Sequence, residues 1–70
     1  MALRLQPLRK ERHITQEGLA TMTGIHRVTI ARYESGAVVP TFENAEKIAD
    51  ALKVSIDDLR GDDHDTTADH

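Results

Sequence analysis

The chain contains no cysteine, so neither disulfide bonds nor thiolate metal ligands can stabilise its fold. It has no tryptophan, one tyrosine and one phenylalanine, which leaves leucine, isoleucine and alanine to form the core. No apolar run approaches the roughly 20 residues that span a membrane, and no apolar signal segment follows Met1. Seventy residues suffice for one domain with a small core, without a catalytic cleft between two domains. These absences predict a soluble, cytoplasmic domain held together by packed helices.

Positive and negative charges are unevenly distributed along the chain. The net charge is −3, which is unusual for a nucleic-acid-binding protein. Residues 1–36 carry six arginines and lysines against three glutamates, whereas residues 37–60 carry three bases against five acids. Residues 61–70 add four aspartates and one small apolar residue, and we expect them to form a disordered acidic tail. The basic first half indicates a polyanionic partner.

The stretch from Thr15 to Gly36 carries the most informative pattern in the chain and reads TQEGLATMTGIHRVTIARYESG. It contains two short helical patterns joined by a turn with a glycine. This is the layout of a helix-turn-helix, whose second helix is shaped to enter a DNA major groove. Apolar residues recur where two such crossed helices would touch, at Leu19, Ala20, Ile25, Ile30 and Tyr33.

Capping residues predict where these two helices begin and end. Thr15 is a suitable N-cap for a helix over about residues 16–22, and Gly24 would end that helix with a positive φ. His26 is the expected N-cap of the following helix, over residues 27–35, which a further glycine ends.

The segment before this motif has two possible readings. Residues 2–6 alternate between apolar and polar, which is typical of a strand or extended arm. Pro7 suits the first position of a helix, so we expect a short helix over about residues 7–12. The alternative is a helix that starts at Ala2 and is kinked at Pro7. An interior proline costs about 3 kcal/mol, which favours the later start.

Two more helices are expected after the motif. A loop over residues 37–40 precedes Thr41, which is a suitable N-cap for a helix through about Lys53. The segment Ser55–Asp58 resembles a capping box that opens a fifth, short helix ending by Gly61. The apolar residues of the fourth helix recur at helical spacing, at Phe42, Ala45, Ile48, Ala49 and Leu52.

In order and spacing, these elements resemble the lambda-repressor/Cro family, often called XRE-type regulators. The resemblance extends from Leu5 to Leu59 and rests on the segments LRKERHITQEGLA, TGIHRVTIARYESG, VP and IADALKVSIDDL. It implies an all-α, compact five-helix domain with the helix-turn-helix at helices two and three. The expected organisation is an N-terminal arm or strand over residues 1–6, the helix-turn-helix domain over residues 7–60 and the tail over residues 61–70.

The resemblance also implies a function. In this family a dimer lays two recognition helices into successive major grooves. The chain is therefore expected to be a sequence-specific transcriptional regulator that binds double-stranded DNA as a homodimer on a near-palindromic operator, without a cofactor. Repression is favoured, because a protein bound at an operator blocks the polymerase.

Six residues are expected to contact DNA. By resemblance, Arg27, Val28 and Arg32 fall where recognition-helix side chains reach bases, and Gln16 and Ser35 fall where the family contacts phosphate. Arginine can grip guanine with two hydrogen bonds, and valine can contact a thymine methyl. The alternative for both arginines is that they are solvated surface charges. His26 is expected to cap its helix and to contact phosphate.

Arg9 and Glu34 match a family pair that forms a buried salt bridge between helices one and three. Glu34 lies near the C-terminal end of its helix, where a negative charge is unfavourable unless a partner offsets it.

The sequence departs from the family pattern at two places. The loop after the third helix reads Ala-Val-Val, where basic residues often grip phosphate. Ala45 stands where a larger apolar residue is usual, so packing there is thinner or is completed by Phe42.

Neither catalysis nor metal binding is favoured by the sequence. The tail residues His64, Asp65, Asp69 and His70 could chelate a metal loosely, but no pair of ligands is held on one helix face as in an HExxH motif. No serine or threonine has a plausible base beside it. We therefore expect neither an enzyme nor a metal site.

A second function class remains open. The domain could be an antitoxin-type interaction module that neutralises a toxin-like protein partner and autoregulates its own operon. The acidic tail could then cover a basic site on that partner.

Overall fold

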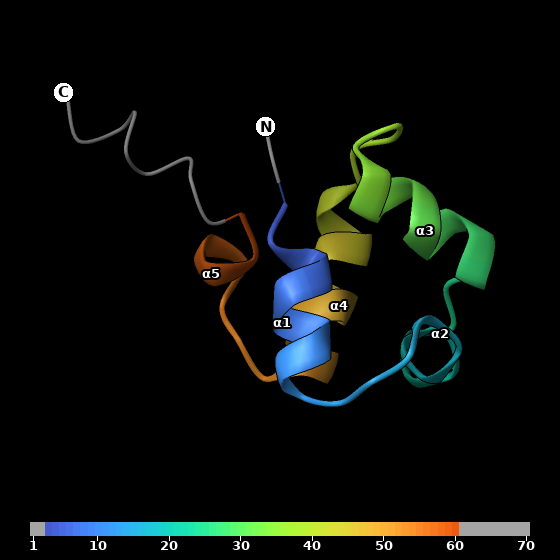
Figure 1. Cartoon of the computed structure of the whole chain (residues 1–70). Coiled ribbons are helices and arrows are strands. Elements are labelled where there is room, and N and C mark those ends of the chain that lie inside the picture. Colours follow the sequence, from blue (N-terminus) through green and yellow to red (C-terminus); the bar gives the residue numbers. More distant parts are fainter. Residues whose placement is uncertain (1–2, 61–70) are drawn as a thin grey trace, which may run out of the picture.

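The computed structural model describes residues 3–60, which fold into five helices (Figure 1). In chain order they are α1 (Leu5–Glu11), α2 (Gln16–Thr23), α3 (Arg27–Ser35), α4 (Phe42–Leu52) and α5 (Ile56–Arg60). No strand occurs in this described range. The expected all-α, five-helix architecture is confirmed. The expected tail over residues 61–70 lies outside the described residues.

Threonine caps begin two helices where the sequence predicts them. The Thr15 Oγ1 atom accepts a hydrogen bond from the Gly18 backbone N–H at 2.9 Å, and the Thr41 Oγ1 atom accepts one from the Asn44 N–H at 3.1 Å. Each bond satisfies an N–H group that has no acceptor within its own helix. A Cβ atom at residue 18 would lie only 3.1 Å from the Thr15 oxygen, which explains why a glycine is tolerated inside α2.

The ends of α2 and α3 and the start of α5 also lie at residues whose types predict a helix end or a helix start. Gly24 and Gly36 end α2 and α3 in the left-handed conformation, with φ angles of 76° and 83°. At the start of α5, the Asp58 N–H donates to Ser55 Oγ at 3.0 Å, and the Ser55 N–H donates to Asp58 Oδ2 at 3.4 Å. These reciprocal bonds confirm the predicted capping box.

The predicted start of the first helix is wrong. The helix begins at Leu5, not at Pro7, and residues 3 and 4 are not helical, so the alternative helix from Ala2 is not formed either. Pro7 is the third residue of α1, where the first-turn N–H groups have no intrahelical acceptor, so its missing N–H loses no bond. The Arg4 N–H donates to the Leu59 carbonyl at 2.8 Å, which ties the start of α1 to α5, and Leu5 is fully buried. Tertiary contacts therefore make Leu5 helical instead of part of an arm.

Apolar side chains from all five helices meet in one core. Helix α2 packs on α3 and α4, α4 packs on α5, and α1 packs on α3. The Asn44 side-chain amide donates to the Tyr33 hydroxyl at 2.9 Å, which adds a polar link between α4 and α3. The core consists of Leu5, Leu8, Leu19, Ile25, Ile30, Tyr33, Ile48, Leu52 and Leu59.

Phe42 does not belong to this core, contrary to its place in the apolar pattern of the fourth helix. Its side chain is 70% exposed. The buried stripe of α4 runs through Ile48, Ala49 and Leu52, in the second half of the helix, whereas Phe42 lies in the first turn. Phe42 therefore does not complete the packing beside Ala45.

The end of α4 places a lysine in a conformation that favours glycine. Lys53 has a φ of 61° and ψ of 43°, and its backbone N–H donates to the Asp50 carbonyl. Side chains with a Cβ atom are strained in this left-handed region. Neighbouring contacts offset this backbone strain. One of them is the hydrogen bond that the Val54 N–H donates to the Ala49 carbonyl at 3.0 Å.

We expect Lys53→Gly to raise the free energy of unfolding by about 1 kcal/mol, because glycine adopts this conformation without a clash between Cβ and the backbone. Urea titration followed by circular dichroism measures the change. Lys53→Ala is the matched control, since it removes the same charge but keeps the Cβ atom, and it should give no such gain. Equal effects of the two substitutions would assign the gain to charge and not to the backbone.

Candidate nucleic-acid interface

A tight turn sets the angle between α2 and α3. The Gly24 N–H donates to the Ala20 carbonyl at 2.8 Å. The Thr23 hydroxyl donates to the Leu19 carbonyl at 2.8 Å and accepts from the Ile25 N–H at 3.2 Å. Ile25 is buried, with 7% of its surface exposed, and anchors the turn in the core. The start of α3 is thus held by both backbone bonds and burial.

His26 caps α3, as the sequence predicts. Its Nδ1 atom accepts a hydrogen bond from the Val28 backbone N–H at 3.1 Å. An imidazole nitrogen that accepts carries no proton, so in the neutral ring the proton is on Nε2. Because the residue is exposed, this N–H remains able to donate to an acceptor outside the protein.

Helix α3 has one buried face and one exposed face. Ile30 and Tyr33 point into the core, with 0% and 4% of their surfaces exposed. Val28, Arg32 and Ser35 follow one another at spacings of four and three residues, so they lie in a row along one exposed face. In Figure 1, α3 lies at the edge of the fold, where no other described helix covers its outer side.

Two guanidinium groups on this exposed side are unpaired within the described part of the chain. Arg27, in the first turn of α3, and Arg32, one turn farther on, form no hydrogen bond or ion pair through their side chains with residues 3–60. Both residues are exposed. The face therefore presents two positive charges and ten N–H donors that no described protein group uses.

The Ser35 hydroxyl is engaged within its own helix end. It donates to the Arg32 carbonyl at 3.1 Å and accepts from the Ala37 N–H at 3.3 Å. Its proton is therefore already used, although the residue is exposed at the C-terminal end of the row.

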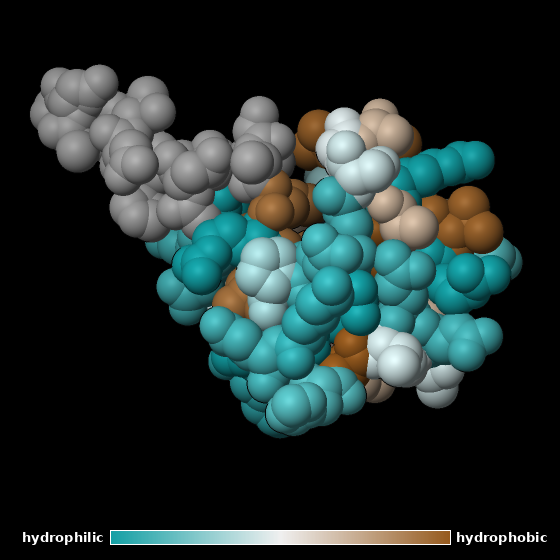
Figure 2. Space-filling view, in the orientation of Figure 1, coloured by the Kyte–Doolittle hydropathy of each residue, from teal (hydrophilic) through white to brown (hydrophobic). Residues whose placement is uncertain are grey.

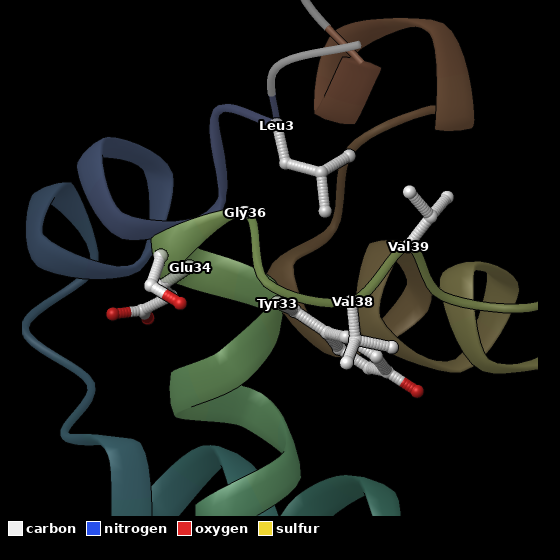
Figure 3. A pocket seen from close by; sticks show the side chains of 7 residues that line it. Leu3, Tyr33, Glu34, Gly36, Val38 and Val39 are labelled. Carbon is white, nitrogen blue, oxygen red and sulfur yellow. The ribbon is translucent and has the colours of Figure 1, made fainter.

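Arg9 and Glu34 form a buried ion pair between α1 and α3. The Arg9 Nε atom lies 2.7 Å from Glu34 Oε2, and Arg9 Nη2 lies 3.3 Å from Glu34 Oε1. Their side chains are 9% and 6% exposed. The Arg9 Nη1 atom also donates to the Ile14 carbonyl at 2.8 Å, in the loop before α2. Figure 3 shows the Glu34 carboxylate turned away from Val38 and Val39.

The Gln16 side chain also binds Glu34, a contact that the sequence did not predict. Its Nε2 atom donates to Glu34 Oε1 at 3.0 Å, so the glutamate binds the first residue of α2 as well as α1. One hydrogen of the Gln16 amide is used in this bond, and the other remains for a second acceptor. The two residues stand 18 positions apart, and no sequence pattern indicates their contact. We refer to Arg9, Gln16 and Glu34 together as the Glu34 cluster.

Other kinds of site are not evident in the described residues. Between residues 3 and 60, no group of three or more histidine, aspartate or glutamate side chains is placed to hold a metal ion. The tail residues His64, Asp65, Asp69 and His70 lie outside that range. No helix in the described part of the chain is long and apolar enough to cross a membrane.

The family comparison covers most of the chain. A model of the helix-turn-helix family matches residues 5–59, from the first residue of α1 to the buried leucine of α5. The match includes both helices of the motif, the Glu34 cluster and the capping box of α5.

Curated relatives are transcriptional regulators. The cryptic phage CTXphi transcriptional repressor RstR of Vibrio cholerae serotype O1 is 48% identical over 58 residues, which cover 83% of this chain and 52% of that protein. The HTH-type transcriptional activator BcrR of Enterococcus faecalis is 38% identical over 56 residues, which cover 80% of this chain and 28% of that protein. The chain thus matches about half or less of the length of these two relatives.

A solved structure of similar fold contains DNA. The P22 c2 repressor protein in complex with synthetic operator 9T superimposes with a TM-score of 0.77 at 35% sequence identity. The superposition covers 84% of this chain and 91% of that one.

We expect Glu34→Ala to lower the free energy of unfolding by about 3–5 kcal/mol, because it leaves the buried Arg9 guanidinium without its counter-charge. Arg9→Ala should have a similar cost, and the double variant should lose less than the sum of the two. Thermal or urea melts of the three variants measure this coupling. Lys10→Ala is the control on the same helix, as an exposed lysine neighbouring Arg9, and should change stability by under about 0.5 kcal/mol. Additive losses from Arg9→Ala and Glu34→Ala would contradict a coupled pair.

Proposed function

Because this chain belongs to the lambda-repressor-like helix-turn-helix family, we propose that it is a transcriptional regulator that binds double-stranded DNA by sequence. The observation that carries this proposal is the exposed face of α3, with two unpaired guanidinium groups on a helix whose other face is anchored in the core. Repression is the favoured outcome, since RstR and the P22 c2 protein are both named repressors. The named activator among the relatives shares only 28% of its length with this chain.

In this proposal, base recognition belongs to the start and middle of α3. Helices that enter the major groove contact base edges mainly from their N-terminal residues, where Arg27 and Val28 lie. Arg27 and Arg32 can each donate two hydrogen bonds to O6 and N7 of a guanine. The Val28 side chain is 41% exposed and suits the methyl group of a thymine.

Phosphate contacts are proposed for three groups around the recognition helix. Gln16 would donate the amide hydrogen that Glu34 does not use, so the Glu34 cluster would hold the phosphate donor in place. His26 would donate from Nε2 while its Nδ1 atom still caps α3. The Ser35 hydroxyl, which donates to the Arg32 carbonyl, would rotate and donate its hydrogen bond to a phosphate oxygen instead. The loop Ala37–Val39 adds no positive charge.

We further propose that the protein acts by binding alone, without a cofactor or a catalysed reaction, and in the cytoplasm, where its DNA target would be. Two copies would bind one near-palindromic operator, because two-fold related recognition helices read two-fold related half-sites. A single recognition helix of nine residues can contact only a limited number of bases. Two half-sites double that number.

Selection of bound sequences from a random DNA pool is expected to return a near-palindrome for the wild-type protein. Arg27→Ala and Arg32→Ala should each change the preferred base at their positions, with a loss of about 1–3 kcal/mol of discrimination. Gln16→Ala should weaken binding to all sequences alike. Lys53→Ala, a charge loss at the far end of α4, is the control and should leave the preference unchanged. An unchanged preference in both arginine variants would show that this face of α3 does not read the bases.

Binding to the selected operator should depend strongly on salt. If a dimer neutralises about six phosphates, the affinity should fall about 10³-fold between 50 and 200 mM monovalent salt. Fluorescence anisotropy with a labelled operator measures the slope, and Lys53→Ala should leave it unchanged. A flat profile would mean that DNA phosphates are not the partners of the basic half of the chain.

A further inference from the structure

A histidine caps α3, whereas threonine hydroxyls cap α2 and α4. The side chains of Thr15 and Thr41 accept the capping hydrogen bonds of those two helices. Helix α3 begins instead at the imidazole of His26, whose backbone is extended, with a φ of −60° and a ψ of 143°. Histidine is the side chain whose charge ordinarily changes between pH 5 and 8, and a hydroxyl carries no charge there. Helix α3 therefore depends on a cap that can gain a proton in this range.

Both the backbone and the side chain of His26 hold the first turn of α3. The His26 carbonyl accepts from the Ile30 N–H at 3.1 Å, and its Nδ1 atom accepts from the Val28 N–H at 3.1 Å. The N–H groups of a first turn have no acceptor within their own helix, so the ring satisfies one of them. Protonation of Nδ1 turns this acceptor into a donor. A doubly protonated ring therefore cannot form the bond to Val28.

A positive charge on the ring would have no counter-charge at this place. The N-terminal end of a helix carries a partial positive charge, and Arg27 follows the cap directly. Between residues 3 and 60, no carboxylate lies within ion-pair distance of His26. The described part of the chain therefore offers no negative group that would replace the lost hydrogen bond.

The charged groups of the neighbouring helices lie toward other parts of α3. Helix α2, which leads into the turn before the cap, has one charged residue, Glu17, in the first turn at its far end. Helix α1 contacts the C-terminal part of α3 through the Arg9–Glu34 pair, and α4 contacts that part through the Tyr33 hydroxyl. The other charged residues of these segments are Lys10, Glu11 and Arg12 at the end of α1, and Glu43, Glu46, Lys47 and Asp50 on α4.

The cap lies where the start of α3 is open to a partner. His26, Arg27 and Val28 are all exposed. Figure 2 keeps the orientation of Figure 1 and shows the region where α3 begins, at the right of the view, as hydrophilic surface in teal beside a smaller apolar area in brown. The ring can thus bind the helix through Nδ1 and an external acceptor through the N–H of Nε2. Only the neutral ring with its proton on Nε2 serves both.

Loss of this cap should affect base contacts more than phosphate contacts. Arg27 and Val28, which are proposed to reach base edges, are the first two residues of α3, and the cap bond ends on one of them. A protonated ring still donates hydrogen bonds and adds a positive charge, which attracts the phosphates of every sequence alike. Protonation therefore acts on sequence preference and not on the general attraction to DNA.

We propose that His26 is a positioning residue for base recognition and that it holds the start of α3 in place only while its ring is neutral. Acid then weakens the preference for the operator and leaves the binding to DNA of any sequence intact. This inference rests on the proposed DNA-binding function, because it concerns the regulation of the same helix.

Binding of the full chain at about pH 8 and about pH 5.5, at constant ionic strength, tests the proposal. The affinity for the operator selected from the random pool is compared with that for a scrambled duplex of the same composition. In the wild-type protein, the ratio of the two affinities should fall about fivefold on acidification, which corresponds to the loss of a typical N-cap. The affinity for the scrambled duplex should not fall. A ratio that is the same at both pH values would overturn the proposal.

Two asparagine substitutions distinguish His26 from the other histidines. Asparagine is a preferred N-cap and does not titrate in this range, so His26→Asn should show one affinity ratio at both pH values, whatever its absolute affinity. His13→Asn is the matched control, because His13 is exposed after α1 with a φ of 57°, a conformation that asparagine tolerates. It should keep the wild-type fall, and both variants retain His64 and His70. An equal fall in His26→Asn and in the wild type would assign the effect to another group and contradict the proposal.

His26→Lys tests the role of the cap without a change of pH. Its ammonium group donates hydrogen bonds to phosphate and carries a positive charge, but it accepts none, as in the protonated ring. At about pH 8 its affinity ratio should be about fivefold below that of the wild type, and acid should not lower it further. Its affinity for the scrambled duplex should not be lower. A His26→Lys variant with the full wild-type ratio would show that the cap does not position the base contacts.

The same measurements distinguish this inference from the proposed function. A wild-type protein that prefers no sequence at about pH 8 would contradict the proposed function, and this inference with it. A clear preference at that pH which neither acid nor His26→Lys weakens would overturn the inference alone, and sequence-specific DNA binding would stand.

Discussion

The carboxylate of Glu34 is the constraint on which the arrangement of the first three helices depends. A buried charge must be fully paired, and this one is bound by two nitrogens of Arg9 and by the Gln16 amide. Arg9 in turn binds the Ile14 carbonyl, so α1, the loop before α2, the start of α2 and the end of α3 meet at one point. Such a cluster adds little net stability over an apolar replacement, but the loss of one partner is costly because it leaves a buried charge unpaired. It therefore ties the end of α3 to α1 and to the start of α2.

Helix α3 combines a buried face with an exposed, basic face because the two lie on different sides of it. Its inner face enters the core through Ile30 and Tyr33. Its outer face presents Arg27, Val28 and Arg32. A small domain with a single modest core can carry both faces only if charge and apolar burial are kept on separate sides of the helix. The net negative charge of the whole chain is compatible with DNA binding for the same reason, since the basic residues are concentrated in its first half.

Most helix limits and the exposed row of α3 were predictable from the sequence. Thr15, Thr41 and the Ser55–Asp58 box act through bonds between residues three positions apart, so their signals are visible in a linear chain. The helical period likewise places Val28, Arg32 and Ser35 in one row once the start of α3 is known. The Arg9–Glu34 contact came from family resemblance and not from the residues alone, because the partners stand 25 positions apart.

The sequence by itself determined where α2 to α5 begin, which residues of α3 share a face and that the fold is all-helical, because these properties depend on nearby residues. Only the tertiary structure decided that α1 extends back to Leu5, that Phe42 is exposed and that Gln16 binds Glu34. Each of these depends on which distant segments meet. The Leu59 carbonyl of α5 binds the chain just before Leu5, and the end of α3 contacts the start of α2. Helix α4 buries only its second half, so Phe42 in its first turn stays exposed. Apolar periodicity indicates which residues can be buried. The packing of the helices determines whether a neighbouring side chain is there to bury them.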